Sequence, residues 1–145
     1  MEWPDGSHLR LIIRPAAEAG TLILRRMSAE MNRAVDAALT RKGLTVAITD
    51  QENVGLIEKL PGSFGAAPLC QLISENRSVK VLSLDGVEPS VEMLALGMYP
   101  YYKELYLITG PKASPAVAEF IGHIFSRQGK SFLTRSGYLV HGTQK

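Results

Sequence analysis

Arg14, Gly20 and Thr21 have the residue types and the spacing that can hold an oxyanion at the start of a helix. They lie in the stretch IIRPAAEAGTLILRR, which reads as a strand, a loop of small residues and a helix. A helix N-terminus offers unpaired backbone N–H groups and the positive end of the helix dipole. Gly20 would let an anion approach the backbone, Thr21 can donate its hydroxyl proton, and Arg14 can engage two oxygens. An ordinary turn with a surface arginine explains the same residues, so both interpretations stay open.

Elsewhere, the residue types that carry catalysis or bind metals are not arranged for either task. The histidines His8, His123 and His141 have no metal-ligand spacing, and neither Cys-x-x-Cys nor His-Glu-x-x-His occurs. The nucleophile motif G-x-S-x-G and the Gly-Lys-Ser/Thr of a P-loop are also missing. Cys70 stands alone in the apolar run APLCQLI, which favours a buried thiol over a nucleophile. We therefore expect no enzyme, no metal site and no cofactor.

The composition is that of a globular domain. The 145 residues are 46% hydrophobic and 21% charged, which is enough for one domain with a buried core. The net charge is +2 and the basic residues are scattered, so the sequence does not predict nucleic-acid binding. No apolar run approaches the ~18 residues of a membrane span. The first ten residues, MEWPDGSHLR, have no basic segment followed by an apolar one, so we expect no signal peptide in this chain.

Alternating strand and helix patterns predict an α/β fold with a parallel or mixed sheet flanked by helices. Strands are expected at residues 9–14, 44–49, 64–67, 79–84 and 102–109, and helices at 21–42, 51–60, around 69–75, after Pro89 and at 114–126. Ser28 is a candidate N-cap that would divide the first helix, and Asp50 is the expected N-cap of the second. Ligands of open α/β sheets bind beyond the carboxyl ends of the strands, where the loop after Arg14 would lie.

Several longer stretches resemble the second half of phosphate-type extracytoplasmic solute-binding proteins of ABC transporters. These are WPDGSHLRLIIRP…AGT, GSFGAAPL, VKVLSLDGVEPSVEML…GMYPYYKELYLIT and SPAVAEFIGHIFSRQGKSFLTRSGYLV. The resemblance covers nearly the whole chain and is most specific over residues 79–109. It implies a periplasmic-binding-protein-like lobe, part of a two-lobe fold, that binds phosphate or a similar oxyanion. It also implies an ABC transporter permease as partner and a periplasmic or other extracytoplasmic location.

The resemblance assigns ligand binding to Arg14, Ala19, Gly20 and Thr21. Ala19 stands where the family has a serine, so one hydroxyl donor is missing from this sequence. Family members have two lobes that close on the anion, and this chain resembles the second. We expect a single domain over residues 1–145: a lobe body (1–78), a crossing segment between lobes (79–112), and a C-terminal helix and tail (113–145).

Two functions of different classes remain open. One is a binding module for an oxyanion, without catalysis; the other is a ligand-free interaction domain that keeps the fold and self-associates. The predicted strand 102–109 and the apolar face of helix 114–126, which carries Phe120, Ile121, Ile124 and Phe125, would pack on first-lobe elements in a two-lobed relative. Burying such a side chain stabilises by about 1.5–3 kcal/mol, and an open strand edge invites pairing. We therefore expect a homodimer through residues 100–140, the alternative being a monomer in which this segment folds back.

Overall fold

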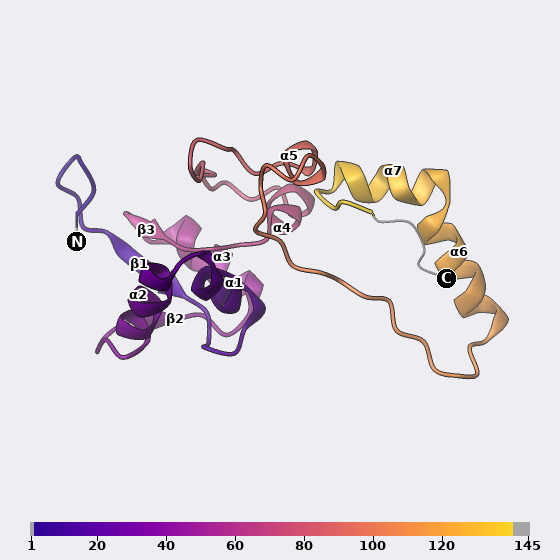
Figure 1. The fold of residues 1–145 in the computed structure, drawn as a ribbon, viewed down its shortest axis with the longest axis horizontal. Helices are drawn as coiled ribbons and strands as arrows, with labels where there is room; N and C mark the ends of the chain where they lie inside the picture. The colour runs from indigo at the N-terminus through magenta and orange to yellow at the C-terminus, as the bar shows by residue number, and fades with distance from the viewer. Residues whose placement is uncertain (1, 141–145) are drawn as a thin grey trace. The chain divides into compact units, whose positions relative to one another are not determined.

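Short strands and helices alternate along the chain in the computed structural model, which describes residues 2–140 (Figure 1). In chain order they are β1 (Arg10–Ile13), α1 (Ala19–Met27), α2 (Ala29–Leu39), β2 (Thr45–Val46), α3 (Asp50–Lys59), β3 (Ser63–Phe64), α4 (Leu69–Ser74), α5 (Val91–Ala95), α6 (Pro115–Phe125) and α7 (Arg127–Arg135). The chain divides into two compact units. The first contains the residues up to Pro68 together with Glu75–Lys80, and the second contains Leu69–Ser74 together with the chain from Val81 onward.

The sheet of the first unit is parallel, with β1 in the centre and the strand order β2-β1-β3. Ile12 pairs with Thr45 on one side, and Leu11 pairs with Phe64 on the other. Because β1 has a neighbour on each edge and α3 packs against it, Ile12 and Ile13 are buried, with Ile12 only 2% exposed, whereas Leu11 is half-buried. The predicted α/β class with a parallel sheet is therefore confirmed.

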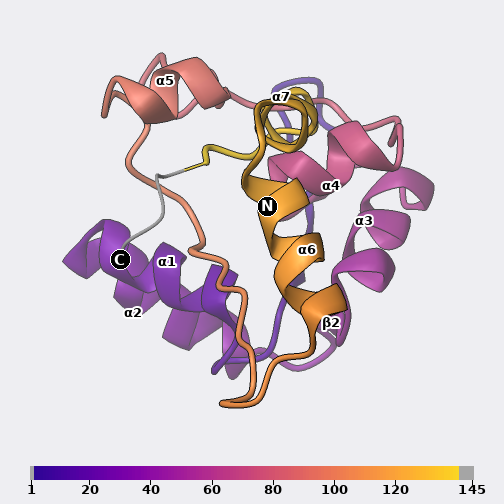
Figure 2. The same cartoon turned by 90° about the vertical axis from the view of Figure 1, so that its right-hand side faces the viewer.

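Helices cover this sheet and complete its core. The helices α1 and α2 lie side by side (Figure 2). The helix α3 packs against β1 and β3. Of the residues that the structure describes, the fully buried apolar ones all belong to this unit: Ile12, Ile13, Val35, Ala47 and Val54. The unit that contains the predicted anion loop thus has a packed core of its own.

Side-chain caps set the helix boundaries. Ser28 ends α1 and accepts a hydrogen bond at 3.0 Å from the backbone N–H of Met31, so the predicted division of the first helix is confirmed. The prediction that Asp50 caps the next helix is wrong. Thr49 is the N-cap of α3, because its hydroxyl accepts a hydrogen bond at 3.1 Å from the backbone N–H of Glu52, and Asp50 is the first helical residue.

The second unit is built from short helices. Ser90 caps α5 and Ser114 caps α6, with Pro115 at the first helical position, as the sequence predicts. The tail contains a further helix, α7, which the periodicity did not reveal; it begins because Ser126 ends α6 and caps the next turn. No helix in the described part of the chain combines the length and apolar character needed to cross a membrane.

Two predicted strands are not strands in the structure. Residues 79–84 form only a single antiparallel bridge between Leu84 and Val87, around the predicted Asp85-Gly86 turn, and residues 102–109 form no pairs within the described chain. Their β-branched and aromatic composition favours extended backbone, but a strand also needs a neighbour that pairs with its N–H and C=O groups. Among residues 2–140 no such neighbour lies beside them, and Ile108 is 91% exposed. The strands β2 and β3 are likewise shorter than predicted.

Candidate anion-binding site

The loop between β1 and α1 brings the predicted ligand residues together. Arg14 follows the last residue of the central strand, and Ala19 and Gly20 open the helix. The hydroxyl of Thr21 donates a hydrogen bond at 3.1 Å to the carbonyl oxygen of Arg14, and Thr21 is only 1% exposed. This bond ties the first turn of α1 to the end of β1. It also uses the single hydroxyl proton of Thr21, so this side chain has no proton left to donate to an anion.

Arg14 is held at the carboxyl ends of two parallel strands. Its Nη1 donates a hydrogen bond at 2.9 Å to the carbonyl oxygen of Ala47, which follows β2. Its side chain is 11% exposed, and its Nε is buried with no hydrogen-bond acceptor among the described residues. A guanidinium has five N–H donors, so the contact with Ala47 leaves capacity for an oxyanion.

Glu18 is the residue of this loop that sequence reasoning missed. Its Oε2 accepts a hydrogen bond at 2.7 Å from the backbone N–H of Gly20 and lies 3.9 Å from Nε of Arg14. A carboxylate therefore already bridges the arginine and the helix N-terminus, the two groups that were expected to hold an anion. The sequence offered only a general signal, because a negative charge near a helix N-terminus stabilises the helix dipole.

Asp50 gives the site a second carboxylate. Its Oδ1 lies 3.4 Å from Nε of Arg14, and it stands at the first position of α3, where a negative charge stabilises the helix dipole. One guanidinium thus faces two carboxylates, those of Glu18 and Asp50. With all three ionised, the sum of one positive and two negative charges is −1. The site has the geometry of an anion cradle and a charge balance that works against an additional anion.

Ala19 contributes backbone only. It is the first residue of α1, and its methyl group offers no donor. Donors to an anion here would be the guanidinium of Arg14 and the N–H groups of the first turn. Of the four predicted residues, Arg14 and Gly20 both approach the carboxylate of Glu18.

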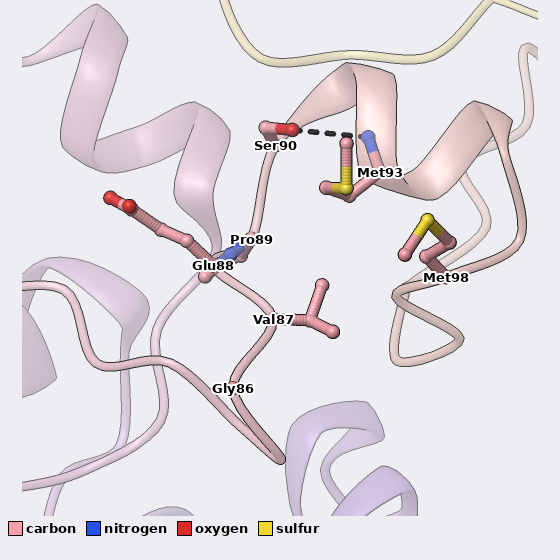
Figure 3. A pocket seen from close by; sticks show the side chains of 7 residues that line it. All are labelled: Gly86, Val87, Glu88, Pro89, Ser90, Met93 and Met98. Atoms are coloured by element: carbon pink, nitrogen blue, oxygen red, sulfur yellow. Dashed lines mark hydrogen bonds between the residues drawn. The ribbon is translucent and has the colours of Figure 1, made fainter.

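The second unit has a hollow that does not suit an anion. It measures about 370 Å³ and is lined by Gly86, Val87, Glu88, Pro89, Ser90, Met93 and Met98. Its one charged lining residue is Glu88, whose side chain points away from the two methionines (Figure 3). A carboxylate with no neighbouring cation repels an oxyanion, so this hollow is not a second candidate for the same ligand.

Metal chemistry has no site in the described residues, and the thiol of Cys70, which was predicted to be buried, is half-buried. No cluster of three His, Cys, Asp or Glu side chains occurs among residues 2–140, and His141 lies outside that range. Cys70 forms no disulfide, and its side chain forms a hydrogen bond with that of Tyr138. This hydrogen bond, together with burial, raises the pKa of Tyr138 to about 12.

Comparison with known proteins finds relatives that are named phosphate-binding proteins. The phosphate-binding protein PstS 2 of Streptococcus agalactiae is 30% identical over 105 residues, which cover 72% of this chain and 33% of that protein. PstS of Bacillus subtilis is 30% identical over 109 residues, covering 73% and 35%. PstS 2 of Streptococcus pneumoniae is 26% identical over 98 residues, covering 68% and 34%. The chain therefore spans about a third of the length of these curated relatives. It matches no family model.

A solved structure supports the fold assignment. The crystal structure of PstS from Borrelia burgdorferi superposes with a TM-score of 0.59 at 18% identity, covering 95% of this chain and 55% of that one. At that identity the likeness concerns the fold alone. The α/β fold of periplasmic-binding-protein type and the resemblance that the sequence motifs indicated are both confirmed. By sequence and by fold, this chain is similar to part of the phosphate-binding proteins named PstS.

Proposed function

We propose that this chain is a binding module for an inorganic oxyanion, most simply phosphate, and that it performs no catalysis. The observation that carries the proposal is the cradle after the central strand: the guanidinium of Arg14 and the N–H of Gly20 both approach one carboxylate oxygen, that of Glu18. A phosphate oxygen has the same acceptor chemistry as a carboxylate oxygen. The names of the relatives favour phosphate over other oxyanions.

In this proposal, Arg14 and the first turn of α1 have separate tasks. Arg14 donates two hydrogen bonds in a fork and supplies the positive charge. Ala19, Gly20 and Thr21 contribute backbone N–H groups at the positive end of the helix dipole. The hydroxyl of Thr21 positions the turn instead of contacting the ligand, because its proton goes to the carbonyl of Arg14.

The family resemblance extends the proposal to the setting. We infer a solute-binding role in ABC-type uptake, with a transporter permease as partner and a periplasmic or other extracytoplasmic location. A lobe that supplies only part of the shell around the anion leaves the anion open to water, so each contact contributes little. Binding by this chain by itself should therefore be weak.

A second candidate function is supported by the apolar surface of the second unit. Leu105, Tyr106 and Ile108 are between 71% and 91% exposed on an extended segment, and Phe120 on α6 is 60% exposed. Exposed apolar side chains of this size commonly mark interaction sites. A ligand-free domain that works by self-association would use this surface and leave the Arg14 loop idle.

Calorimetric titration of phosphate into the chain and two arginine variants tests the first function. Arg14→Ala should weaken binding by about 1.5–3 kcal/mol, the usual worth of a charge-assisted hydrogen bond. Arg10→Ala is the matched control: Arg10 lies at the other end of β1, where it donates to the carbonyl of Pro61, and its loss should leave affinity unchanged. Equal affinity in Arg14→Ala and the unaltered chain would contradict the assignment, and no binding by the unaltered chain would favour the second function.

A further inference from the structure

The carboxylate of Glu18 sits in the cradle as a ligand would. One oxygen, Oε2, accepts the Gly20 N–H at 2.7 Å and lies 3.9 Å from Nε of Arg14. The Glu18 side chain is only 17% exposed, so the carboxylate is largely withdrawn from water in this position. Asp50 approaches the same Nε from α3, at 3.4 Å.

We propose that Glu18 is an internal competitor of the oxyanion: its carboxylate closes the cradle, and an anion binds only when that carboxylate swings out. This inference rests on the proposed function and adds a regulatory contact to it. A single N–H group makes one good hydrogen bond, so the Gly20 N–H cannot serve Glu18 and an anion equally well at once. Two negative charges within about 4 Å of each other also repel strongly where water is largely excluded.

The hydrogen bond of Glu18 with Gly20 and its ion pair with Arg14 both lie within the loop and the first turn of α1. Glu18 is the N-cap residue of α1 and lies outside the helix proper, so its side chain can rotate into solvent without unfolding a turn. The freed Gly20 N–H and the Arg14 guanidinium then both face the entering anion. The measured affinity for an anion is therefore the intrinsic affinity of the cradle reduced by the work of moving Glu18.

If Glu18 competes with the anion, replacing it should raise the affinity for anions, which the loss of a purely structural N-cap would not do. In Glu18→Gln, the amide oxygen can still accept the Gly20 N–H, so the cap is kept and the charge is removed. In Glu18→Ser, a hydroxyl caps the helix equally well and leaves more room. Both variants should bind inorganic phosphate and sulfate about tenfold more tightly than the unaltered chain, which is the effect of one charge at a helix N-terminus in a favourable geometry. A residue that only capped the helix would leave affinity the same or lower it.

Two glutamates elsewhere in the same unit supply matched controls. Glu52 also accepts a backbone N–H near a helix start, that of Ile48 at 2.7 Å, and Glu30 pairs with Arg33 on the exposed face of α2. Glu52→Gln and Glu30→Gln each change the net charge by the same one unit. Titrated by calorimetry with phosphate and with sulfate at about 0.15 M ionic strength, they should stay within about twofold of the unaltered chain, because salt screens these exposed charges.

The outcomes separate this inference from the proposed function. The competitor role of Glu18 is supported if Glu18→Gln and Glu18→Ser gain more affinity for phosphate and sulfate than both control variants. A second outcome is that the unaltered chain binds phosphate, that Arg14→Ala weakens this binding, and that the Glu18 variants gain no more affinity than the controls. In that case Glu18 is not a competitor, and the proposed binding function is retained. If neither the unaltered chain nor any Glu18 variant binds, both proposals are overturned. Thermal melts of each variant, followed by circular dichroism, verify that the variants compared are folded.

Discussion

The hydroxyl of Thr21 and the carbonyl oxygen of Arg14 are joined by a 3.1 Å hydrogen bond, which fastens the first turn of α1 to the end of β1. Thr21 is almost completely buried, so no water can take over this bond if it is lost. The relative position of the guanidinium and the helix N-terminus depends on it.

Thr21→Val should therefore destabilise the fold by about 1–3 kcal/mol, because the Arg14 carbonyl loses the donor that the buried Thr21 supplies while the side-chain volume stays the same. Thr21→Ser keeps the hydroxyl and loses one methyl group, so it should be less harmful, at about 1 kcal/mol. Urea unfolding monitored by circular dichroism measures both. Equal stability of Thr21→Val and the unaltered chain would show that the hydrogen bond contributes nothing.

Gly65, just after β3, is required by close packing against the central strand. A Cβ added there would lie 2.8 Å from the carbonyl oxygen of Ile12, which is backbone and cannot move aside easily. Gly65→Ala should destabilise the chain by about 1–3 kcal/mol, the usual effect of overpacking. Gly55→Ala is the control, because Gly55 is in α3 with nothing within 4 Å, and alanine should stabilise that helix by about 0.5–1 kcal/mol. The two changes in urea midpoint should have opposite signs.

Tyr138 should make stability fall at high pH. Its pKa is raised to about 12 by the hydrogen bond with Cys70 and by burial, whereas in the unfolded chain it would ionise near pH ~10. The folded state therefore holds this proton more tightly. The resulting stabilisation is complete below pH ~10 and is lost as the pH rises through the folded value. Urea midpoints measured across this range should drop less in Tyr138→Phe than in the unaltered chain.

The homodimer is still a prediction, and exposed residues of the second unit provide sites at which to test it. Ile108 is 91% exposed and lies in the segment 100–140 that is expected to form the interface. Light scattering at micromolar concentration should give the mass of a dimer for the unaltered chain and of a monomer for Ile108→Lys. Leu96→Lys, at a site that is 62% exposed but outside that segment, should remain dimeric. A monomeric unaltered chain would rule the dimer out.

Local features of the fold could be predicted from the sequence, and features that depend on distant pairing could not. Ser28, Ser90 and Ser114 were recognisable as caps because a cap and the N–H it accepts are three residues apart. The same reasoning should have favoured Thr49 over Asp50, since Thr49 and Glu52 form the capping-box pattern. Residues 79–84 and 102–109 have strand composition, but their lack of paired neighbours in the described chain is a property of the whole fold.

The same limit applies to the candidate site. The order of strand, Arg14, small residues and Gly20-Thr21 predicted the loop and the helix start. The contacts of Arg14 with Ala47 and Asp50 could not be predicted, because both partners lie more than thirty residues away in sequence. Glu18 was missed for another reason. A side chain beside a ligand site can either contact the ligand or occupy the ligand's place, and only the geometry of the site distinguishes these two roles.

Phosphate titration followed by amide NMR would detect an oxyanion bound at the start of α1. The backbone N–H signals of Ala19, Gly20 and Thr21 should shift most, in a saturable manner, because these groups lie at the N-terminus of α1. In Arg14→Ala the same shifts should shrink or vanish at equal phosphate concentration. Saturable shifts confined to other residues, such as those lining the hollow around Met93 and Met98, would rule out anion binding at the start of α1, and so would shifts at Gly20 that are unchanged in Arg14→Ala.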